Sequence, residues 1–364
     1  MIKLAQRQSV PWWRTEAADA VRRNSGLIGV LLILALVGVV TRPEQFPTWS
    51  NVSTVLTLAS AIGVITIGMT FVMIGGGIDL SVGGLVALAG VWCTTLETQS
   101  YGPAGMIFCA LTVGLGAGLI NGILIAYGRL VPFIATLAML VAARGLAAQI
   151  SDRRTQIVEV DAINDIAATD VFGIPLLVLI LVAVAVLAWI LLNRTTFGRR
   201  TVAVGGNPEA ARLAGINVRF HTVLLYALSG LCCGIAAVMV VAQANAGSSG
   251  QGNLYELDAI AAAIIGGTAL SGGRGTIVGS LLGVLVFTVI TNLFILNNLP
   301  TEVQNIIKGA IIVGAVLIQQ IRWRDVRLAA RRRPGEPPIA EPSPSQPTGD
   351  RHDSPHSVTP QISR

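Results

Sequence analysis

The sequence predicts an all-α membrane protein that crosses the bilayer about ten times. Apolar residues make up 53% of the 364 residues and charged residues only 12%, whereas an ordinary soluble domain is about 25% charged. The apolar residues gather in long runs, and a membrane helix needs about 20 residues of this kind. The 40 glycines suit a bundle whose helices approach closely. These observations argue against a soluble enzyme with a large separate domain.

The apolar runs give the predicted spans in chain order. The first run follows a basic amphipathic segment and lacks the small-residue cleavage site of a signal peptide, so we expect an uncleaved helix. The run 258–270 is short for a full crossing. The predicted spans are 26–40, 52–74, 80–96, 104–126, 131–150, 173–192, 220–243, 258–270, 277–296 and 303–321.

Charges between the spans predict the orientation. Segment 194–219 carries five arginines against one acid, whereas segment 151–172 carries five acids against two arginines. Basic loops stay in the cytoplasm, so 194–219 is expected inside, 151–172 outside and both termini inside. The predicted domains are a basic cytoplasmic segment, 1–25, and a membrane domain, 26–321.

The composition changes after the last predicted span. Residues 322–333 are mostly basic or apolar, and eight of the 16 prolines lie after residue 333. Such a proline-rich segment with few large apolar residues cannot form a core. We therefore predict that 322–364 is a basic and then disordered cytoplasmic tail.

Several kinds of site are not predicted. The net charge of +6 comes largely from basic residues that flank spans, which argues against nucleic-acid binding. The four cysteines lie within apolar runs and the three histidines are isolated, so neither a metal site nor a disulfide framework is expected. Of the two lysines, Lys3 and Lys308, neither lies in a phosphate-binding loop. Glycines at every fourth position in 114–122 and 279–283 predict close helix packing instead.

Two glycine-rich segments of similar sequence interrupt the predicted spans. Residues 74–84 read IGGGIDLSVGG and residues 265–273 read IGGTALSGG, and their portions IGGGIDLS and IGGTALS align with a gap of one residue. Each follows a span that runs inward and precedes one that runs outward, so we predict a parallel internal repeat. Glycine-interrupted helices in transporter repeats point to the substrate path. The predicted path residues are Gly76, Gly77, Asp79, Ser81, Gly266, Gly267 and Thr268.

Asp79 is an ionisable residue within the predicted membrane domain, and such residues are commonly functional. A carboxylate there suits a proton- or ion-coupled carrier, but Asp is also a good N-cap for the helix that follows. Arg144 and Lys308 lie in or near spans as well, where they either line a polar path or extend to the membrane surface. The sequence leaves these alternatives open.

The segment 205–215 has the signals of a short, capped helix in the largest cytoplasmic loop. Asn207 is a favoured N-cap, Pro208 suits the first helical position and Glu209 complements the positive helix end. Gly215 can take the left-handed conformation that closes a helix. Because so short a helix is not stable alone, it packs either on its own membrane domain or on a cytoplasmic partner.

Three motifs in this order resemble one family, the permease subunits of ribose-type monosaccharide ABC importers. They are GGIDLSVG at 76–83, the stretch from TFGR through GGN to GI at 196–216, and GGT followed by LSGGRG within 266–279. The resemblance covers about residues 50–321. The first 25 residues and the proline-rich tail fall outside it.

The resemblance implies a permease of the type II architecture found in vitamin B12 importers, in a bacterial inner membrane. It implies a homodimer with two cytoplasmic ATP-binding subunits, which would hold ATP and Mg²⁺, and an extracytoplasmic sugar-binding protein. This chain would bind no cofactor or metal and catalyse no reaction. The short capped helix would be the element that couples it to the ATPase. The predicted coupling residues are Gly205, Gly206, Asn207, Pro208, Glu209, Ala210, Ala211, Arg212 and Gly215.

Two other functions fit parts of the sequence. An ion-coupled secondary sugar carrier would use Asp79, and a membrane enzyme would use outside acids such as Asp161 and Asp165. The enzyme hypothesis is the weaker of the two, since neither a histidine nor a second acidic motif accompanies these acids. For an importer, the sequence leaves the solute open within the ribose, xylose and galactose class.

Overall fold

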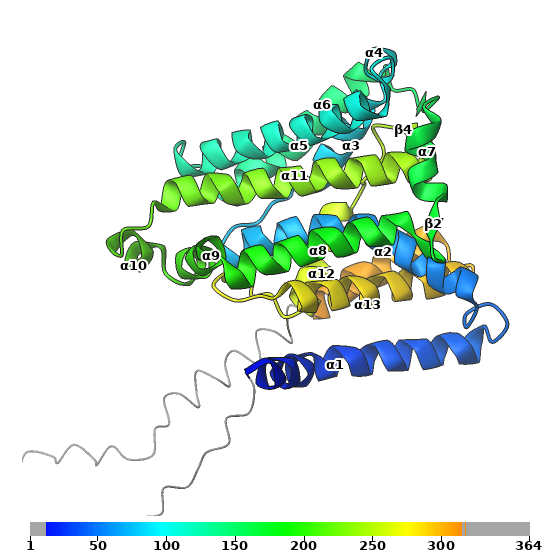
Figure 1. Ribbon diagram of the computed structural model, residues 1–364, viewed down its shortest axis with the longest axis horizontal. Coiled ribbons are helices and arrows are strands. Elements are labelled where there is room, and N and C mark those ends of the chain that lie inside the picture. The colour runs from blue at the N-terminus through cyan, green and yellow to red at the C-terminus, as the bar shows by residue number, and fades with distance from the viewer. Residues whose placement is uncertain (1–11, 315–316, 318–364) are drawn as a thin grey trace, which may run out of the picture. The chain divides into compact units, whose positions relative to one another are not determined.

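The computed structural model describes residues 12–314 and 317. Within these residues the chain forms helices α1 to α13, a further helical stretch at 301–314 and four strands of two residues each (Figure 1). The first eleven residues and the predicted tail, 322–364, lie outside the described part of the chain.

Seven helices of the described chain are long and apolar enough to cross a membrane, which confirms a polytopic helical membrane protein. Most residues in the apolar parts of α2 and α11 are buried, so these two helices form the centre of the bundle. In α6 and α8 only a minority of the residues are buried. The seven helices are α1 (Trp12–Thr41), α2 (Trp49–Ile74), α5 (Gly102–Ala126), α6 (Pro132–Ile150), α8 (Leu176–Arg194), α11 (Val218–Ala244) and α13 (Ile277–Leu296).

Two predicted crossings are shorter than expected. α3 (Val82–Cys93) has 12 residues and α12 (Tyr255–Ile265) has 11, so each spans only about half of a hydrocarbon core of about 30 Å. The predicted bounds 80–96 and 258–270 are therefore wrong: the glycine-rich break occupies 80–81, a turn at Thr94 and Thr95 ends α3, and a glycine-rich turn replaces helix after Ile265. The last predicted span, 303–321, is helical over 301–314, and most of the remainder is not described.

Glycines bring helices into backbone contact, as their spacing predicted. A Cβ on Gly114 of α5 would overlap the Gly230 carbonyl oxygen of α11, and one on Gly118 would lie 3.0 Å from Gly230 Cα. In the same way, a Cβ on Gly283 of α13 would overlap the Ala262 carbonyl oxygen of α12. These contacts confirm the close-packing interpretation of both glycine series.

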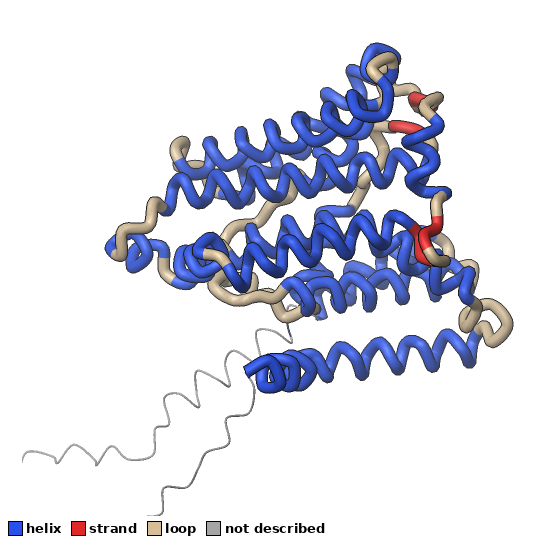
Figure 2. The backbone as a smooth tube through the Cα atoms, in the orientation of Figure 1, coloured by secondary structure: helices blue, strands red, loops and turns tan. Residues whose placement is uncertain are grey.

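The two ends of the bundle differ in construction, as Figures 1 and 2 show. At one end, α9 (Thr196–Gly206) and α10 (Pro208–Leu213) connect α8 to α11. We call this the α10 end and the opposite one the α7 end. The α7 end carries α4 (Leu96–Gln99), α7 (Asp161–Ala168) and two antiparallel pairs, β1 (Gln156–Ile157) with β4 (Ala246–Gly247) and β2 (Asp170–Val171) with β3 (Ile174–Pro175).

Candidate functional site

The two glycine-rich segments end their helices in the same way. We call residues 75–81, between α2 and α3, the first break, and residues 266–276, between α12 and α13, the second break. Gly76 has φ +86° and Gly267 has φ +87°. The N–H of the next residue then bonds a carbonyl five residues back, at 2.9 Å in both cases, from Gly77 to Val72 and from Thr268 to Ala263. Both are therefore glycine C-caps of one geometry.

The first break is organised by the buried carboxylate of Asp79. Its Oδ1 accepts hydrogen bonds from the backbone N–H of Ser81, at 3.0 Å, and from the Ser81 hydroxyl. Its Oδ2 accepts from the Ser229 hydroxyl of α11 at 2.8 Å. The Asn121 amide of α5 donates to Ser81 Oγ at 2.9 Å. Asp79 thus orders the turn that leads into α3 and is fully buried. It is not the predicted N-cap, because Ser81 holds that position and no side chain caps α3.

The backbone of the first break is also satisfied from neighbouring helices. The Ile78 carbonyl oxygen accepts the Tyr226 hydroxyl of α11 at 3.2 Å and the Thr136 hydroxyl of α6 at 3.4 Å. Irregular backbone at membrane depth needs such partners inside the protein. The sequence analysis did not predict the three partners Ser229, Asn121 and Tyr226. The sequence marks them only as polar residues within apolar runs.

The second break has no acid in its turn. Its backbone closes on itself, since Ala269 N–H donates to the Arg274 carbonyl oxygen at 2.9 Å. Thr268 Oγ1 lies 3.2 Å from Ser280 Oγ of α13, which accepts the Thr70 hydroxyl of α2 at 2.8 Å. The second break is therefore fastened to α13 and α2 by hydroxyl groups.

The predicted coupling helix forms as α10, with both ends as expected. Asn207 Oδ1 accepts from Ala210 N–H at 3.0 Å, Pro208 occupies the first helical position, and Gly215 closes the helix at φ +83°. Glu209 and Arg212 form an exposed ion pair at 2.9 Å. Ala211 alone of this helix is buried. Most of the α10 surface is consequently available to a partner.

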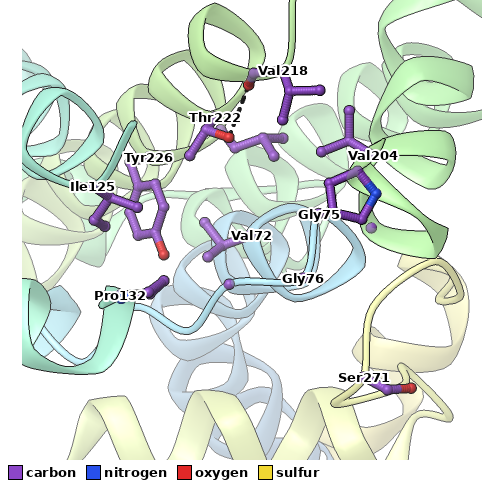
Figure 3. A pocket seen from close by; sticks show the side chains of 14 residues that line it. Val72, Gly75, Gly76, Ile125, Pro132, Val204, Val218, Thr222, Tyr226 and Ser271 are labelled. Carbon is purple, nitrogen blue, oxygen red and sulfur yellow. Dashed lines mark hydrogen bonds between the residues drawn. The ribbon is translucent and has the colours of Figure 1, made fainter. Parts of the chain in front are cut away.

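Parts of the two predicted residue sets meet at a cavity of about 340 Å³ at the α10 end (Figure 3). Gly76 and Gly77 of the first break line it together with Gly205 and Pro208. Asp79, Ser81 and Thr268, in contrast, are fully buried elsewhere in the protein. The cavity thus brings Gly76 and Gly77 of the predicted path set next to two residues of the coupling set, whereas Gly266, Gly267 and the polar members of the path set do not line it.

Arg144 takes neither of the two predicted roles. From α6 it donates to the carbonyl oxygens of Ser249 and Gln251, at 3.2 and 3.3 Å, and of Gly252, at 2.9 Å. These carbonyls belong to the non-helical stretch between β4 and α12. Lys308 lies 3.4 Å from Asp258 of α12. Both basic groups therefore hold the short helix α12 and its approach in place.

Comparison with known proteins decides the family. A family described as "Branched-chain amino acid transport system / permease component" matches residues 51–316. The chain is 37% identical over 308 residues to the ribose import permease protein of Bacillus subtilis (strain 168), which covers 83% of this chain and 94% of that protein. The chain belongs to the ABC importer permease family. The L-arabinose ABC transporter permease protein of Azospirillum brasilense is a further relative, 36% identical over 299 residues, with 82% of this chain and 88% of that protein covered.

A third relative is the galactose/methyl galactoside import permease protein of Escherichia coli (strain K12), at 32% identity over 320 residues and 83% and 95% coverage. No solved structure matches the chain. The family confirms the resemblance to ribose-type sugar permeases, and with the apolar helices it makes this permease a multi-pass inner-membrane protein. It favours an importer subunit over an ion-coupled carrier, and a transport component over an enzyme.

Proposed function

We propose that this permease forms the membrane path of an ATP-driven importer for a monosaccharide of the ribose, xylose and galactose class. It would act as a homodimer with two ATP-binding subunits and receive its sugar from an extracytoplasmic binding protein. The names of its relatives, which import ribose, arabinose and galactose, support a sugar as solute.

The observation that carries the proposal is α10 itself. It is a short helix, capped at both ends, that protrudes at one end of a membrane bundle and keeps nearly all of its surface free. Leu213 exposes 84% of its surface there, which an apolar groove in a partner would cover. We infer that residues 205–215 dock on the ATP-binding subunit, which would hold ATP and Mg²⁺.

The charges support one orientation of the bundle. Five arginines lie between residues 194 and 219 at the α10 end, whereas the acids of 151–172 gather at the α7 end. The rule that basic loops face the cytoplasm places the α10 end inside. Both chain termini would then be cytoplasmic, with ten crossings in the type II arrangement if α3, α12 and the helix from residue 301 each count as one.

The test is transport by the assembled importer in proteoliposomes. We would purify the permease with the ATP-binding subunit and the sugar-binding protein of its own organism and measure ATP-dependent uptake of radiolabelled D-ribose, D-xylose, D-galactose and L-arabinose. Glu209→Arg should abolish co-purification of the ATP-binding subunit and uptake, while the permease still folds. Asp165→Arg, an exposed acid on α7, is the charge-matched control.

Two results would contradict parts of this proposal. Uptake that needs an ion gradient but no ATP, and is lost in Asp79→Asn, would replace the importer with the secondary carrier. Normal ATP-driven uptake in Glu209→Arg would leave the importer intact and remove the coupling role of α10.

A further inference from the structure

Three backbone segments from distant parts of the chain meet near the α10 end. They are residues 74–76 at the end of α2, 205–206 at the end of α9, and 272–273 in the second break. Gly273 N–H donates to the Ile74 carbonyl oxygen at 2.8 Å. A Cβ on Gly205 would overlap that same oxygen and lie 2.7 Å from Gly273 N. We call this three-way contact the glycine joint.

The glycine joint consists of backbone on all three sides. A Cβ on Gly272 would lie 2.9 Å from Gly76 Cα and 2.7 Å from the Gly205 carbonyl oxygen. A Cβ on Gly273 would lie 2.9 Å from Gly206 Cα. Side chains can absorb a displacement by changing rotamer, but backbones in direct contact cannot. A movement of any one segment is therefore passed to the other two.

The glycine joint is connected directly to α10. Only Asn207 separates α9 from α10, and it bonds to both: its N–H donates to the Ala203 carbonyl oxygen, and its side chain accepts from Ala210 N–H, each at 3.0 Å. α10 also buries the side chain of Ala211. Because α10 is joined to α9 through Asn207 alone, a displacement of α10 would act on Gly205, two residues before Asn207.

We propose that Gly205 is a positioning residue for transport, which transmits the displacement of α10 to both breaks at once. This inference rests on the proposed function, in which the ATP-binding subunit moves α10. The first break leads to α3 and the Asp79 hydrogen bonds, and the second leads to α13. One displacement at the glycine joint would thus shift both halves of the internal repeat together, as a switch between two packed states requires.

The cavity beside the glycine joint supplies the room for that movement. Gly205 is part of its lining. The adjacent residue Val204 lies across the cavity from Tyr226 of α11 (Figure 3). The glycine joint therefore has close backbone contact on one side and about 340 Å³ of space on the other, into which it could be displaced.

The experiment compares two adjacent alanine substitutions in the full importer in proteoliposomes. In Gly205→Ala the new methyl group meets the Ile74 carbonyl oxygen, whereas in Gly206→Ala it meets no atom within 4 Å. Both positions lie in α9, so helix propensity is matched. The readouts are ATP hydrolysis stimulated by the binding protein, uptake of the sugar that the wild type transports, their ratio, and assembly by size-exclusion chromatography.

For Gly205→Ala we expect a complex that assembles and hydrolyses ATP but transports about tenfold less sugar per ATP. A factor of this size is usual when the coupling between two sites is lost. Gly206→Ala should keep the wild-type ratio. A wild-type ratio in Gly205→Ala, or a proportional fall of uptake and ATP hydrolysis, would overturn the inference. Because the comparison needs a wild type with ATP-driven uptake, failure of the wild type would instead refute the proposed function.

A second variant covers the case in which Gly205→Ala does not assemble. Thr222→Phe would fill the cavity from the α11 side without changing the three backbone segments of the glycine joint, and the lost hydroxyl donates to the Val218 carbonyl oxygen of its own helix. It should also lower transport per ATP while ATP hydrolysis persists. An unchanged ratio in this variant would show that the cavity is not needed and would remove the joint as a moving part.

Discussion

The first and second breaks have the same backbone geometry and different surroundings. Both begin with a glycine C-cap whose second glycine is left-handed, at φ +86° and +87°. In the first break a long helix precedes the cap and a short one follows, α2 and α3, whereas the order is reversed for α12 and α13. The glycine pair thus fixes how a helix ends, while the packing partners fix how far it runs.

The two breaks are also held in place by different kinds of contact. The first break is held by hydrogen bonds to the Asp79 carboxylate and to the Ile78 carbonyl oxygen. The second lies directly against the backbone of α13, where a Cβ on Gly266 would come within 2.6 Å of Ser280 Cα. We therefore expect the first break to be sensitive to polar changes and the second to added volume.

The largest difference should come from alanine at the two equivalent capping positions. Gly266→Ala pushes a methyl group into the Gly279 backbone, whereas Gly75→Ala overlaps only a side-chain end, that of Leu225, and approaches the nearest backbone atom, the Val72 carbonyl oxygen, to 3.3 Å. We expect a loss of unfolding free energy of about 3 kcal/mol for Gly266→Ala and about 1 kcal/mol for Gly75→Ala. Denaturation in detergent measures both. Gly309→Ala, which meets no atom within 4 Å, is the control, and equal losses would contradict the comparison.

The second-largest loss of unfolding free energy is expected when the Asp79 carboxylate of the first break is removed. Asp79→Ala leaves the Ser81 N–H and the Ser229 hydroxyl without their acceptor, at a cost of about 2 kcal/mol. Asp79→Asn keeps an acceptor oxygen and should lose less than Asp79→Ala. Denaturation in detergent, with uptake measured beside it, separates this structural role from ion coupling. Retention of ATP-driven uptake by Asp79→Asn is expected, and its complete loss in a stable protein would show that Asp79 does more than order the turn.

The shared cap predicts equal effects at the second glycine of each break. Gly76→Ala and Gly267→Ala both place a Cβ on a left-handed residue, which costs about 1–2 kcal/mol. Neither position is crowded, since the first atom met lies 3.6 Å away at Gly76 and nothing lies within 4 Å at Gly267. Asparagine should cost less than alanine at both sites. A clear difference between the two alanine variants would mean that the breaks are not equivalent.

The smallest effect is expected at the hydroxyl contact of the second break. Thr268→Val keeps the shape of the side chain and removes its contact with Ser280 Oγ, which should cost about 1 kcal/mol. Transport per ATP should stay at the wild-type value, because this contact is not part of the glycine joint. Reduced transport per ATP in Thr268→Val would place the second break's hydroxyl groups in the transport step itself.

Local sequence predicted the features that depend on a few neighbouring residues. The glycine pairs end α2 and α12, and Asn207 and Gly215 bound α10, because caps are made by backbone conformation and by side chains within one turn. The glycine spacing in α5 predicted its close approach to another helix for the same reason, since a fourfold repeat lies on one helix face.

Tertiary structure alone decided which of these features touch. Asp79 meets Ser229 across 150 positions of sequence, and Arg144 meets Gly252 across 108. The glycine joint brings Ile74, Gly205 and Gly273 together from three separate parts of the chain. A sequence pattern reports the conformation that a residue favours, but which residue lies opposite it depends on how whole helices pack, and glycine leaves no side chain from which that contact could be foreseen.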